Sequence, residues 1–324
     1  MQVNILITSA GRRVSLLKAF QKELRSRFPG GEVFAVDYNP DLAPACHVAH
    51  KSFRVPKLSD PTYADRLLEL CIKYQVKLVI PTIDTELIIL AGKADEFRSH
   101  GIQIIISSLE FVRTCRNKRS VHAFFESREI KVAREYSKQD YEIPLFIKPL
   151  EGSGSSNTRA ILSADQLLEE QVLDSNLMFL EYYDKKEYDE FTSDLYYDKQ
   201  GILRCVVPRK RIEVREGEVS KAVTKRNILI DFIKDHLGHV DGARGCITLQ
   251  LFKEKDGDDV IGIEINPRFG GGYPLSYLAG ANYPAWIIQE YLKHDTIEDR
   301  FDCWEEDLLL LRYDNEILSR GYKG

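Results

Sequence analysis

A stretch near the C-terminal end of the chain carries the side chains best suited to chemistry. Residues 260–272 read VIGIEINPRFGGG, so an acid, an amide and an arginine interrupt a segment that is otherwise apolar. Because side chains alternate across a β-strand, Glu264 and Asn266 share one face. The isoleucines at positions 263 and 265 share the other. We interpret the isoleucine face as packing and the polar face as a site.

A second alternating segment lies just before this one. Residues 247–252 read ITLQLF, and the linker to the first strand contains the turn sequence Asp256-Gly257. A hairpin folded about this turn places Gln250 opposite Glu264, next to Asn266. Carboxylate and amide oxygens without thiol or imidazole suit magnesium. The alternative for Glu264 alone is a satisfied polar pair beside a sheet edge.

A candidate phosphate-binding segment lies in the middle of the chain. A predicted strand over residues 145–149 carries Lys148 and runs into the loop LEGSGSSN. Backbone amides and hydroxyls of such a loop can approach phosphate oxygens, and the lysine adds a charge. It is not a Walker loop, because the lysine precedes the glycines. A plain flexible hairpin is the alternative. Lys118, which opens a predicted helix, offers a second cation.

The next predicted strand ends in an acid and two aromatic residues. Residues 177–183 read LMFLEYY, and Glu187 follows shortly after. An adenine needs an apolar slot with a few polar partners at one edge. A ribose needs an acceptor for its hydroxyl groups. Glu181, Tyr182 and Tyr183 fit the first need, and Glu187 fits the second.

The first 110 residues must provide a scaffold, because strands and helices alternate there. We predict strands at 4–8, 32–36, 78–81 and 102–106 and helices at 14–27, 63–74 and 86–98. Such alternation implies a parallel sheet with right-handed crossovers. Gly11 is a lone glycine where the dinucleotide fingerprint needs three. We therefore expect a Rossmann-like scaffold without a nicotinamide cofactor.

Ligands tend to bind at the carboxyl ends of such parallel strands. Asp84 and Glu86 follow the predicted strand at 78–81. They bind an amine or cap the next helix, and for each residue alone capping is the preferred interpretation. The other side chains expected to line the crevice are Thr8, Ser9, Arg12, Asp37 and Thr82.

Further substrate-binding candidates flank the polar strand. Gly271 and Gly272 follow Arg268 and either cradle an acyl phosphate or form a tight turn before a predicted helix at 285–292. Arg209 and Lys221 flank a polar hairpin. These cations grip a carboxylate or the γ-phosphate, or else belong to a solvated face.

Composition narrows the class of protein. The 324 residues are 44% hydrophobic and 29% charged, as in a globular chain of two or three domains. A net charge of -5 is not typical of a nucleic-acid-binding protein. No apolar run approaches membrane-spanning length, and the N-terminus is typical of a core strand. Six cysteines without a CxxC pair suit a reducing compartment. We expect a cytoplasmic protein with neither nucleic acid nor membrane as partner.

Taken in chain order, these motifs resemble the ATP-grasp superfamily, closest to the branch of the carbamoyl phosphate synthase large subunit. The segment EINPR at 264–268 is the most specific piece. The resemblance implies an α/β fold with an α+β lid. It divides the chain into a Rossmann-like preATP-grasp domain (1–110), a linker helix with the lid (111–190) and a C-terminal ATP-grasp part (191–324).

The resemblance also implies roles for individual residues. Magnesium ligands are Gln250, Glu264 and Asn266, and Arg268 and Lys148 are the catalytic cations. The residues placed against ATP are Lys118, Lys148, Glu151, Ser153, Gly154, Ser155, Ser156, Glu181, Tyr182, Tyr183 and Glu187. Many members carry an acid where Gln250 stands, so a second magnesium is expected to bind less tightly.

The implied activity is an ADP-forming carboxylate-amine ligase that uses ATP and Mg²⁺, with Mn²⁺ as the alternative ion. Its partners are a small carboxylate and an amine. Two alternatives stay open: synthesis of carboxyphosphate or carbamoyl phosphate from bicarbonate, and a nucleotide-binding subunit without turnover. The sequence does not fix the oligomeric state, and a homodimer is one option.

Overall fold

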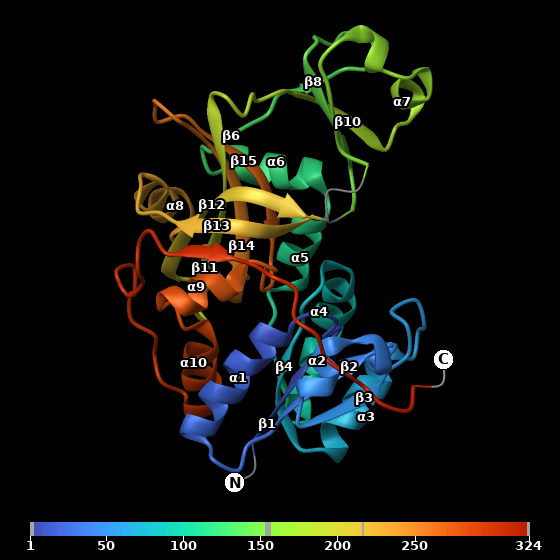
Figure 1. Ribbon diagram of the computed structural model, residues 1–324, viewed down its shortest axis with the longest axis vertical. Helices are drawn as coiled ribbons and strands as arrows, with labels where there is room; N and C mark the ends of the chain where they lie inside the picture. The colour runs from blue at the N-terminus through green and yellow to red at the C-terminus, as the bar shows by residue number, and fades with distance from the viewer. Residues whose placement is uncertain (1–2, 153–156, 216, 323–324) are drawn as a thin grey trace.

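The computed structural model describes residues 3–152, 157–215 and 217–322. Three β-sheets of five, four and seven strands form the frame (Figure 1). The five-stranded sheet lies at the N-terminal end of the molecule, and the four-stranded sheet forms a lid at the other end. The seven-stranded sheet lies between them. The expected α/β architecture with a separate lid is confirmed.

The five-stranded sheet is parallel throughout, in the order β3-β2-β1-β4-β5. Its strands are β1 (Asn4–Ile7), β2 (Val33–Asp37), β3 (Lys51–Arg54), β4 (Val76–Ile80) and β5 (Gln103–Ile104). Its helices are α1 (Val14–Arg27), α2 (Pro44–Val48), α3 (Tyr63–Lys73) and α4 (Asp84–Ser99), with the short 3-10 helix η1 (Pro40–Leu42). Helix α1 has the predicted bounds, because its apolar residues at helical spacing are buried.

The lid sheet is antiparallel, in the order β7-β10-β8-β9. It contains β7 (Glu135–Tyr136), β8 (Leu145–Pro149), β9 (Arg159–Ile161) and β10 (Leu177–Glu181), with α7 (Glu169–Leu173) and the 3-10 helix η2 (Ala164–Gln166). The lid has a small apolar core of its own, whose buried members are Leu145, Ile147, Ile161 and Phe179.

The seven-stranded sheet carries the predicted polar hairpin. Its order is β16-β13-β12-β11-β14-β15-β6, and only the β15–β6 pair is parallel. Its strands are β6 (Lys131–Val132), β11 (Tyr188–Tyr197), β12 (Leu203–Arg215), β13 (Glu218–Thr224), β14 (Gly245–Glu254), β15 (Val260–Asn266) and β16 (Leu309–Leu311). The predicted pairing of Gln250 with Glu264 is confirmed. A bulge follows, because the next pair is Leu251 with Gly262, which leaves Ile263 without a partner in β14.

Helices flank this sheet and connect it to the other parts. They are α5 (Leu109–Arg116), α6 (Lys118–Glu126), α8 (Leu229–Leu237), α9 (Tyr273–Ala279) and α10 (Tyr283–Ile288), followed by the π-helical turn η3 (Gln289–Lys293). The helix predicted at 285–292 is therefore split between α10 and η3. In the described part of the chain, no helix combines the length and apolar character that crossing a bilayer requires.

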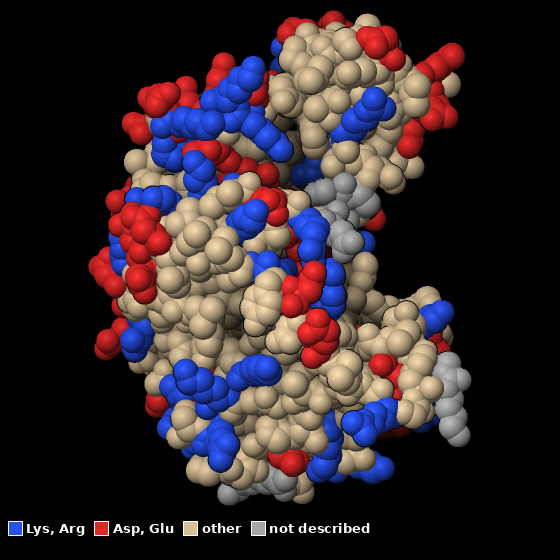
Figure 2. Space-filling view, viewed as in Figure 1, with Lys and Arg blue, Asp and Glu red and all other residues tan. Residues whose placement is uncertain are grey.

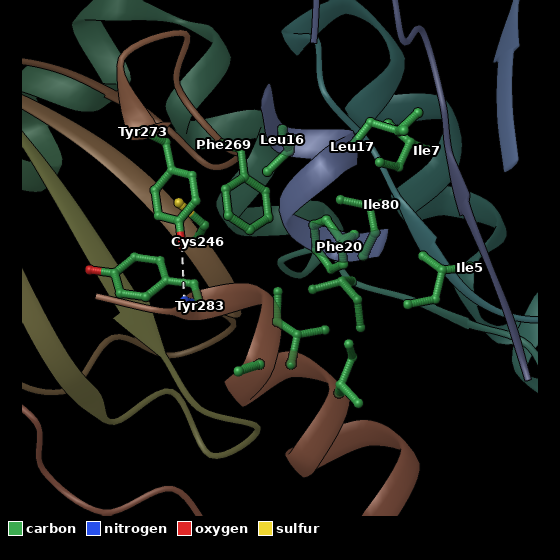
Figure 3. Packing of buried hydrophobic residues seen from close by; sticks show 14 of the residues in the cluster. Ile5, Ile7, Leu16, Leu17, Phe20, Ile80, Cys246, Phe269, Tyr273 and Tyr283 are labelled. Carbon is green, nitrogen blue, oxygen red and sulfur yellow. Dashed lines mark hydrogen bonds between the residues drawn. The ribbon is translucent and has the colours of Figure 1, made fainter. Parts of the chain in front are cut away.

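The N-terminal and C-terminal parts share one hydrophobic core. Phe20 of α1 packs edge-on against Phe269, with ring centroids 5.9 Å apart, and Phe269 packs on Tyr273 at 4.7 Å (Figure 3). The hydroxyl of Tyr273 accepts a hydrogen bond of 2.9 Å from the backbone N–H of Tyr283. Because one apolar cluster spans both parts, their relative position is fixed by packing.

Candidate active site

A pocket of about 330 Å³ lies between the lid and the seven-stranded sheet. The molecular surface is hollowed beneath the lid, and side chains of both charges lie along the inside (Figure 2). A volume of this size is typical of small-ligand sites. The sequence-predicted residues that line it are Lys118, Lys148, Glu151, Glu181, Tyr182, Tyr183, Gln250 and Glu264. Ser153, Gly154, Ser155 and Ser156 lie outside the described residues.

Glu264 is the anionic centre of the pocket floor. Its Oε1 accepts hydrogen bonds from Gln250 Nε2 at 2.9 Å and from Asn266 Nδ2 at 3.0 Å. Its Oε2 lies 3.6 Å from the Nζ of Lys148. Burial alone would raise the pKa of Glu264, but Lys148, the Asn266 amide and Lys118 together lower it. The carboxylate is therefore ionised at neutral pH.

Two buried lysines approach this carboxylate from different elements. Lys148 comes from lid strand β8 and donates to the carbonyl of Ile263 at 3.3 Å. Lys118 is the first residue of α6 and donates to the carbonyl of Gly152 at 3.3 Å. Burial, followed by the charge of Lys148, lowers the pKa of Lys118. Two like charges beside Glu264 in one pocket favour a further anion, such as a phosphate.

The donor set fits a hard cation. Its possible ligands are one carboxylate and two amides, all oxygen donors, which is the chemistry Mg²⁺ prefers. Rotating the side-chain amide of Gln250 or Asn266 by half a revolution would point its oxygen, in place of its nitrogen, toward a cation beside Glu264. Among the described residues, no group of three or more His, Cys, Asp or Glu could hold a metal. The site thus suits an ion that takes much of its shell from phosphate and water.

The opposite end of the pocket is apolar with a polar edge. The ring of Tyr183 stacks on Phe252 with centroids 5.8 Å apart. Its hydroxyl donates to Glu181 Oε2 at 3.0 Å. Phe146, Ile261 and Leu180 add apolar lining. This arrangement provides the slot that a flat heteroaromatic ring requires.

Glu187, the predicted ribose ligand, is exposed and does not line this pocket. Glu190, three residues further along, does. Arg211 also lines the pocket, where its Nη1 contacts Glu190 Oε1 and the Oε1 of Gln250, the latter at 3.3 Å. Neither residue was predicted from the sequence, because their approach depends on strands β11 and β12.

Arg268 forms an ion pair with Asp84 of the N-terminal part. Its Nε and Nη2 donate to the two carboxylate oxygens of Asp84 at 3.0 and 2.5 Å. Burial would lower the pKa of Arg268, but Asp84 raises it. A small cavity lined by Asp84, Glu264 and Asn266 connects this pair to the pocket floor. The structure therefore brings together residues predicted independently in the crevice and on the polar strand.

Glu86 has the capping role that the sequence left open. It is fully buried, and its carboxylate accepts from the backbone N–H groups of Thr82 and Ile83 at 2.7 and 3.1 Å. The hydroxyl of Ser9 donates to it at 2.8 Å. Burial raises the pKa of Glu86. Its oxygens are thus occupied by neighbouring groups of the scaffold.

The remaining substrate candidates lie outside both cavities. Arg209 is buried and forms a two-bond ion pair with Asp194, at 2.8 and 3.1 Å. Lys221 is exposed and pairs with Glu213 at 2.7 Å. The alternative of a solvated face thus describes Lys221, whereas Arg209 belongs to the interior. Gly272 packs on the Arg209 guanidinium, and the carbonyl of Gly271 accepts from Arg312 at 2.5 Å.

A Rossmann-like sheet, an antiparallel lid and a charged pocket beneath it define an ATP-grasp fold. Residues 5–105 match the family described as PylC-like, N-terminal domain. Residues 174–306 match the family described as ATP-grasp in the biosynthetic pathway with Ter operon. The chain belongs to the ATP-grasp superfamily. No curated protein matches it.

Several solved structures share this fold. The biotin carboxylase domain of the Hydrogenobacter thermophilus 2-oxoglutarate carboxylase has a TM-score of 0.69 at 12% identity, over 94% of this chain and 73% of that one. N5-carboxyaminoimidazole synthetase of Staphylococcus aureus has a TM-score of 0.67 at 15% identity, over 91% and 78%. L-amino acid ligase of Bacillus licheniformis has a TM-score of 0.66 at 17% identity, over 90% and 74%. At such identities the likeness is one of fold.

Proposed function

We propose that the protein is an ADP-forming ligase that uses ATP and Mg²⁺ to activate a small carboxylate as an acyl phosphate, which an amine or similar nucleophile then attacks. The observation that carries this proposal is the charge cluster around Glu264 at the pocket floor, whose other members are Lys118, Lys148, Gln250 and Asn266. The matched ATP-grasp family supports it.

The chemistry requires two anions to approach each other. A carboxylate oxygen attacks the γ-phosphorus of ATP, the bond to ADP breaks, and the nucleophile later displaces phosphate from the acyl carbon. Lys118 and Lys148 offset the charge of the phosphate oxygens, and Arg268, held by Asp84, steadies the transferring group. Mg²⁺ or Mn²⁺ held by Gln250, Glu264 and Asn266 would act as a Lewis acid on the phosphates.

The nucleotide is proposed to lie along the pocket from the aromatic slot to the floor. Tyr182, Tyr183 and Glu181 would hold the adenine. Glu190 rather than the exposed Glu187 is the better placed acceptor for ribose hydroxyls. In this arrangement residues 111–190 supply the linker helix and the lid, residues 191–324 the floor, and residues 1–110 the far wall.

The test is ADP release from purified protein with ATP, Mg²⁺ and pools of carboxylates and amines, with the product read by mass. Glu264→Ala should lower metal-dependent ADP formation by about 10²- to 10³-fold, the usual effect of removing one electrostatic group from an active site. Glu298→Ala, which alters an exposed residue far along the chain, is the matched control. Unchanged turnover in Glu264→Ala would overturn the proposal.

Bicarbonate is the second candidate for the activated acid. The Hydrogenobacter carboxylase domain was solved with bicarbonate alongside MgADP. ADP release stimulated by bicarbonate alone, with no response to organic acids, would favour this activity. The homodimer and the cytoplasmic location expected from the sequence stay predictions.

A further inference from the structure

An arginine that the proposed chemistry does not use lies at the switch point of the parallel sheet. In the order β3-β2-β1-β4-β5, successive strands are added on one side of β1 up to β3 and on its other side from β4 onward, and ligands of such sheets bind in the crevice outside the carboxyl ends of β1 and β4. Arg13 follows β1 and its Nη2 donates to the carbonyl of Thr82, just after β4, at 3.2 Å. Its guanidinium therefore spans this crevice.

The groups facing Arg13 come from distant parts of the chain. Arg268, Asp84, Glu218 and Arg312 all act electrostatically on it. These four form two ion pairs, because Arg268 binds Asp84 with two hydrogen bonds and Arg312 lies 2.8 Å from Glu218. Counted with these two ion pairs, Arg13 leaves one positive charge in excess.

That charge belongs to Arg13. Among the described residues, no carboxylate oxygen lies within ion-pair distance of its guanidinium, although Asp84 and Glu218 are near enough to act on it through space. Burial and then the charge of Arg268 lower the pKa of Arg13 to about 10. The group is thus still charged at neutral pH, and among the described residues its direct hydrogen-bond acceptor is a neutral carbonyl, that of Thr82.

The loop after Arg268 runs close beside this cation. A Cβ atom added to Gly271 would lie 3.2 Å from the Nη1 of Arg13 and 2.9 Å from Glu218 Oε1. A side chain at position 271 would therefore crowd the guanidinium, and glycine avoids this contact. The shared aromatic core next to this loop fixes the distance between the two parts.

The crevice is also connected to the pocket floor. Asp84 lines the small cavity that contains Glu264 and Asn266, and its partner Arg268 acts electrostatically on both Glu264 and Arg13. Cationic groups thus follow one another from Lys148 through Arg268 to Arg13. A ligand whose one end reacts at the floor can place its other end against Arg13.

We propose that Arg13 binds a second, non-reacting carboxylate of the acid substrate, so that the preferred acids carry two carboxylates. This inference rests on the proposed ligase function for the identity of the reacting end. The guanidinium fork matches a carboxylate with two parallel hydrogen bonds. Arg13 is in this sense a specificity residue, while Glu264 and the lysines serve the nucleotide.

The test measures binding without turnover. Succinate and glutarate, each compared with its monomethyl ester, are titrated into the wild-type protein and Arg13→Gln by calorimetry, with and without ADP and Mg²⁺. We expect the diacid to bind about 10- to 100-fold more tightly than its ester in wild type, the range for one charge-assisted hydrogen-bonding group. Arg13→Gln should remove this preference, and Arg13→Lys should retain part of it.

The design separates folding and function from recognition. The Arg13 side chain does not cap α1, so its replacement spares the helix start, and circular dichroism checks this. Arg25→Gln, an exposed arginine of the same helix, should keep the wild-type preference. Equal binding of diacid and ester in wild type, or an unchanged preference in Arg13→Gln, would overturn the inference. Failure of the ligase proposal would instead appear as absent ADP formation with the Arg13-dependent preference intact.

Discussion

The two walls of the candidate active site are attached to the seven-stranded sheet by different forces. On the proposed substrate side, Phe20, Phe269 and Tyr273 join the N-terminal part to the C-terminal part through one continuous apolar core. On the proposed nucleotide side, the lid has a separate small core and meets the rest of the molecule through polar contacts, such as those of Lys118 and Lys148 with backbone carbonyls.

This difference teaches how the site is organised. Packed apolar surface holds one geometry, whereas a few polar contacts without a shared apolar core constrain the position of a domain less. The substrate wall is thus set in advance by the fold. The nucleotide wall depends on charges that a bound phosphate would reinforce, so the lid is the part whose position ligands can change.

The largest expected effect comes from breaking each core in turn. Phe269→Ala should lower the free energy of unfolding of the whole molecule by about 3–5 kcal/mol, because a buried ring is lost from the shared core. Phe179→Ala in the lid core should reduce hydrogen-exchange protection of the lid alone. Denaturant unfolding combined with exchange measurements separates the two. Equal global destabilisation by both variants would mean that the lid is not an independent unit.

Removing the lid lysine should come next in size. Lys148→Ala deletes the cation that joins β8 to the pocket floor, so ADP formation should fall about 10²-fold. Calorimetry should show weaker ATP binding, with the melting temperature little changed in the absence of nucleotide. Lys77→Ala, in the N-terminal sheet, serves as the control. Unaltered nucleotide affinity would remove Lys148 from the site.

The pH dependence of stability should report the buried His122 on the nucleotide side. Burial and then the charge of Lys148 lower the pKa of His122 to about 4. Between pH 6.5 and 4 the unfolded chain takes up a proton at this residue and the folded protein does not, so stability falls as the pH falls. The loss should reach about 2 kcal/mol between pH 7.5 and pH 5.

Urea unfolding of the wild type and His122→Gln at these two pH values measures this effect. The variant should lose less stability on acidification than the wild type. Identical slopes for the two proteins would show that His122 does not remain neutral in the folded state.

The smallest effect is expected at the exposed ion pair between the lid and helix α6. Arg119 lies 2.8 Å from Glu135, and both side chains are partly exposed. Arg119→Ala should cost less than about 1 kcal/mol of stability, as is usual for surface ion pairs. Lid protection in hydrogen exchange should fall slightly while the substrate wall stays unchanged. A loss of several kcal/mol would mean that polar contacts hold the lid more firmly than the shared core holds the other wall.

How much could be predicted from the sequence depended on how local the pattern was. Helix α1 and the pairing of Gln250 with Glu264 follow from periodicity and from one turn sequence. Strand β11 reads YDEFTSDLYY, and its acidic residues are untypical of a strand in the centre of a sheet. The sequence therefore did not predict Glu190 as a pocket residue or its contact with Arg211. Asp84 and Arg268 are 184 positions apart, and no local pattern predicts their contact.

Arg13 shows the same limit. The sequence shows that Arg13 follows the first strand. Its role in recognition, however, depends on the side chains that surround it in the folded protein. Here three of those groups, Glu218, Arg268 and Arg312, come from the C-terminal half of the chain. The lone Gly11 argues against a dinucleotide fingerprint, yet it does not indicate which neighbouring residue serves the crevice.

The bulge at Ile263 changes which residues of strand β15 face the pocket, from odd-numbered to even-numbered positions. Before the bulge, the side chain that shares a face with Phe252 is the odd-numbered Ile261, whereas after it the even-numbered Glu264 and Asn266 occupy that face. One extra residue thus lets a single strand present an aliphatic wall to the proposed adenine end of the pocket and oxygen ligands to the proposed phosphate end. Ile263, which has no partner residue in β14, uses its carbonyl to accept a hydrogen bond from the ammonium group of Lys148 in the lid. A perfectly regular strand of this sequence would turn either its wall or its acid away from the nucleotide.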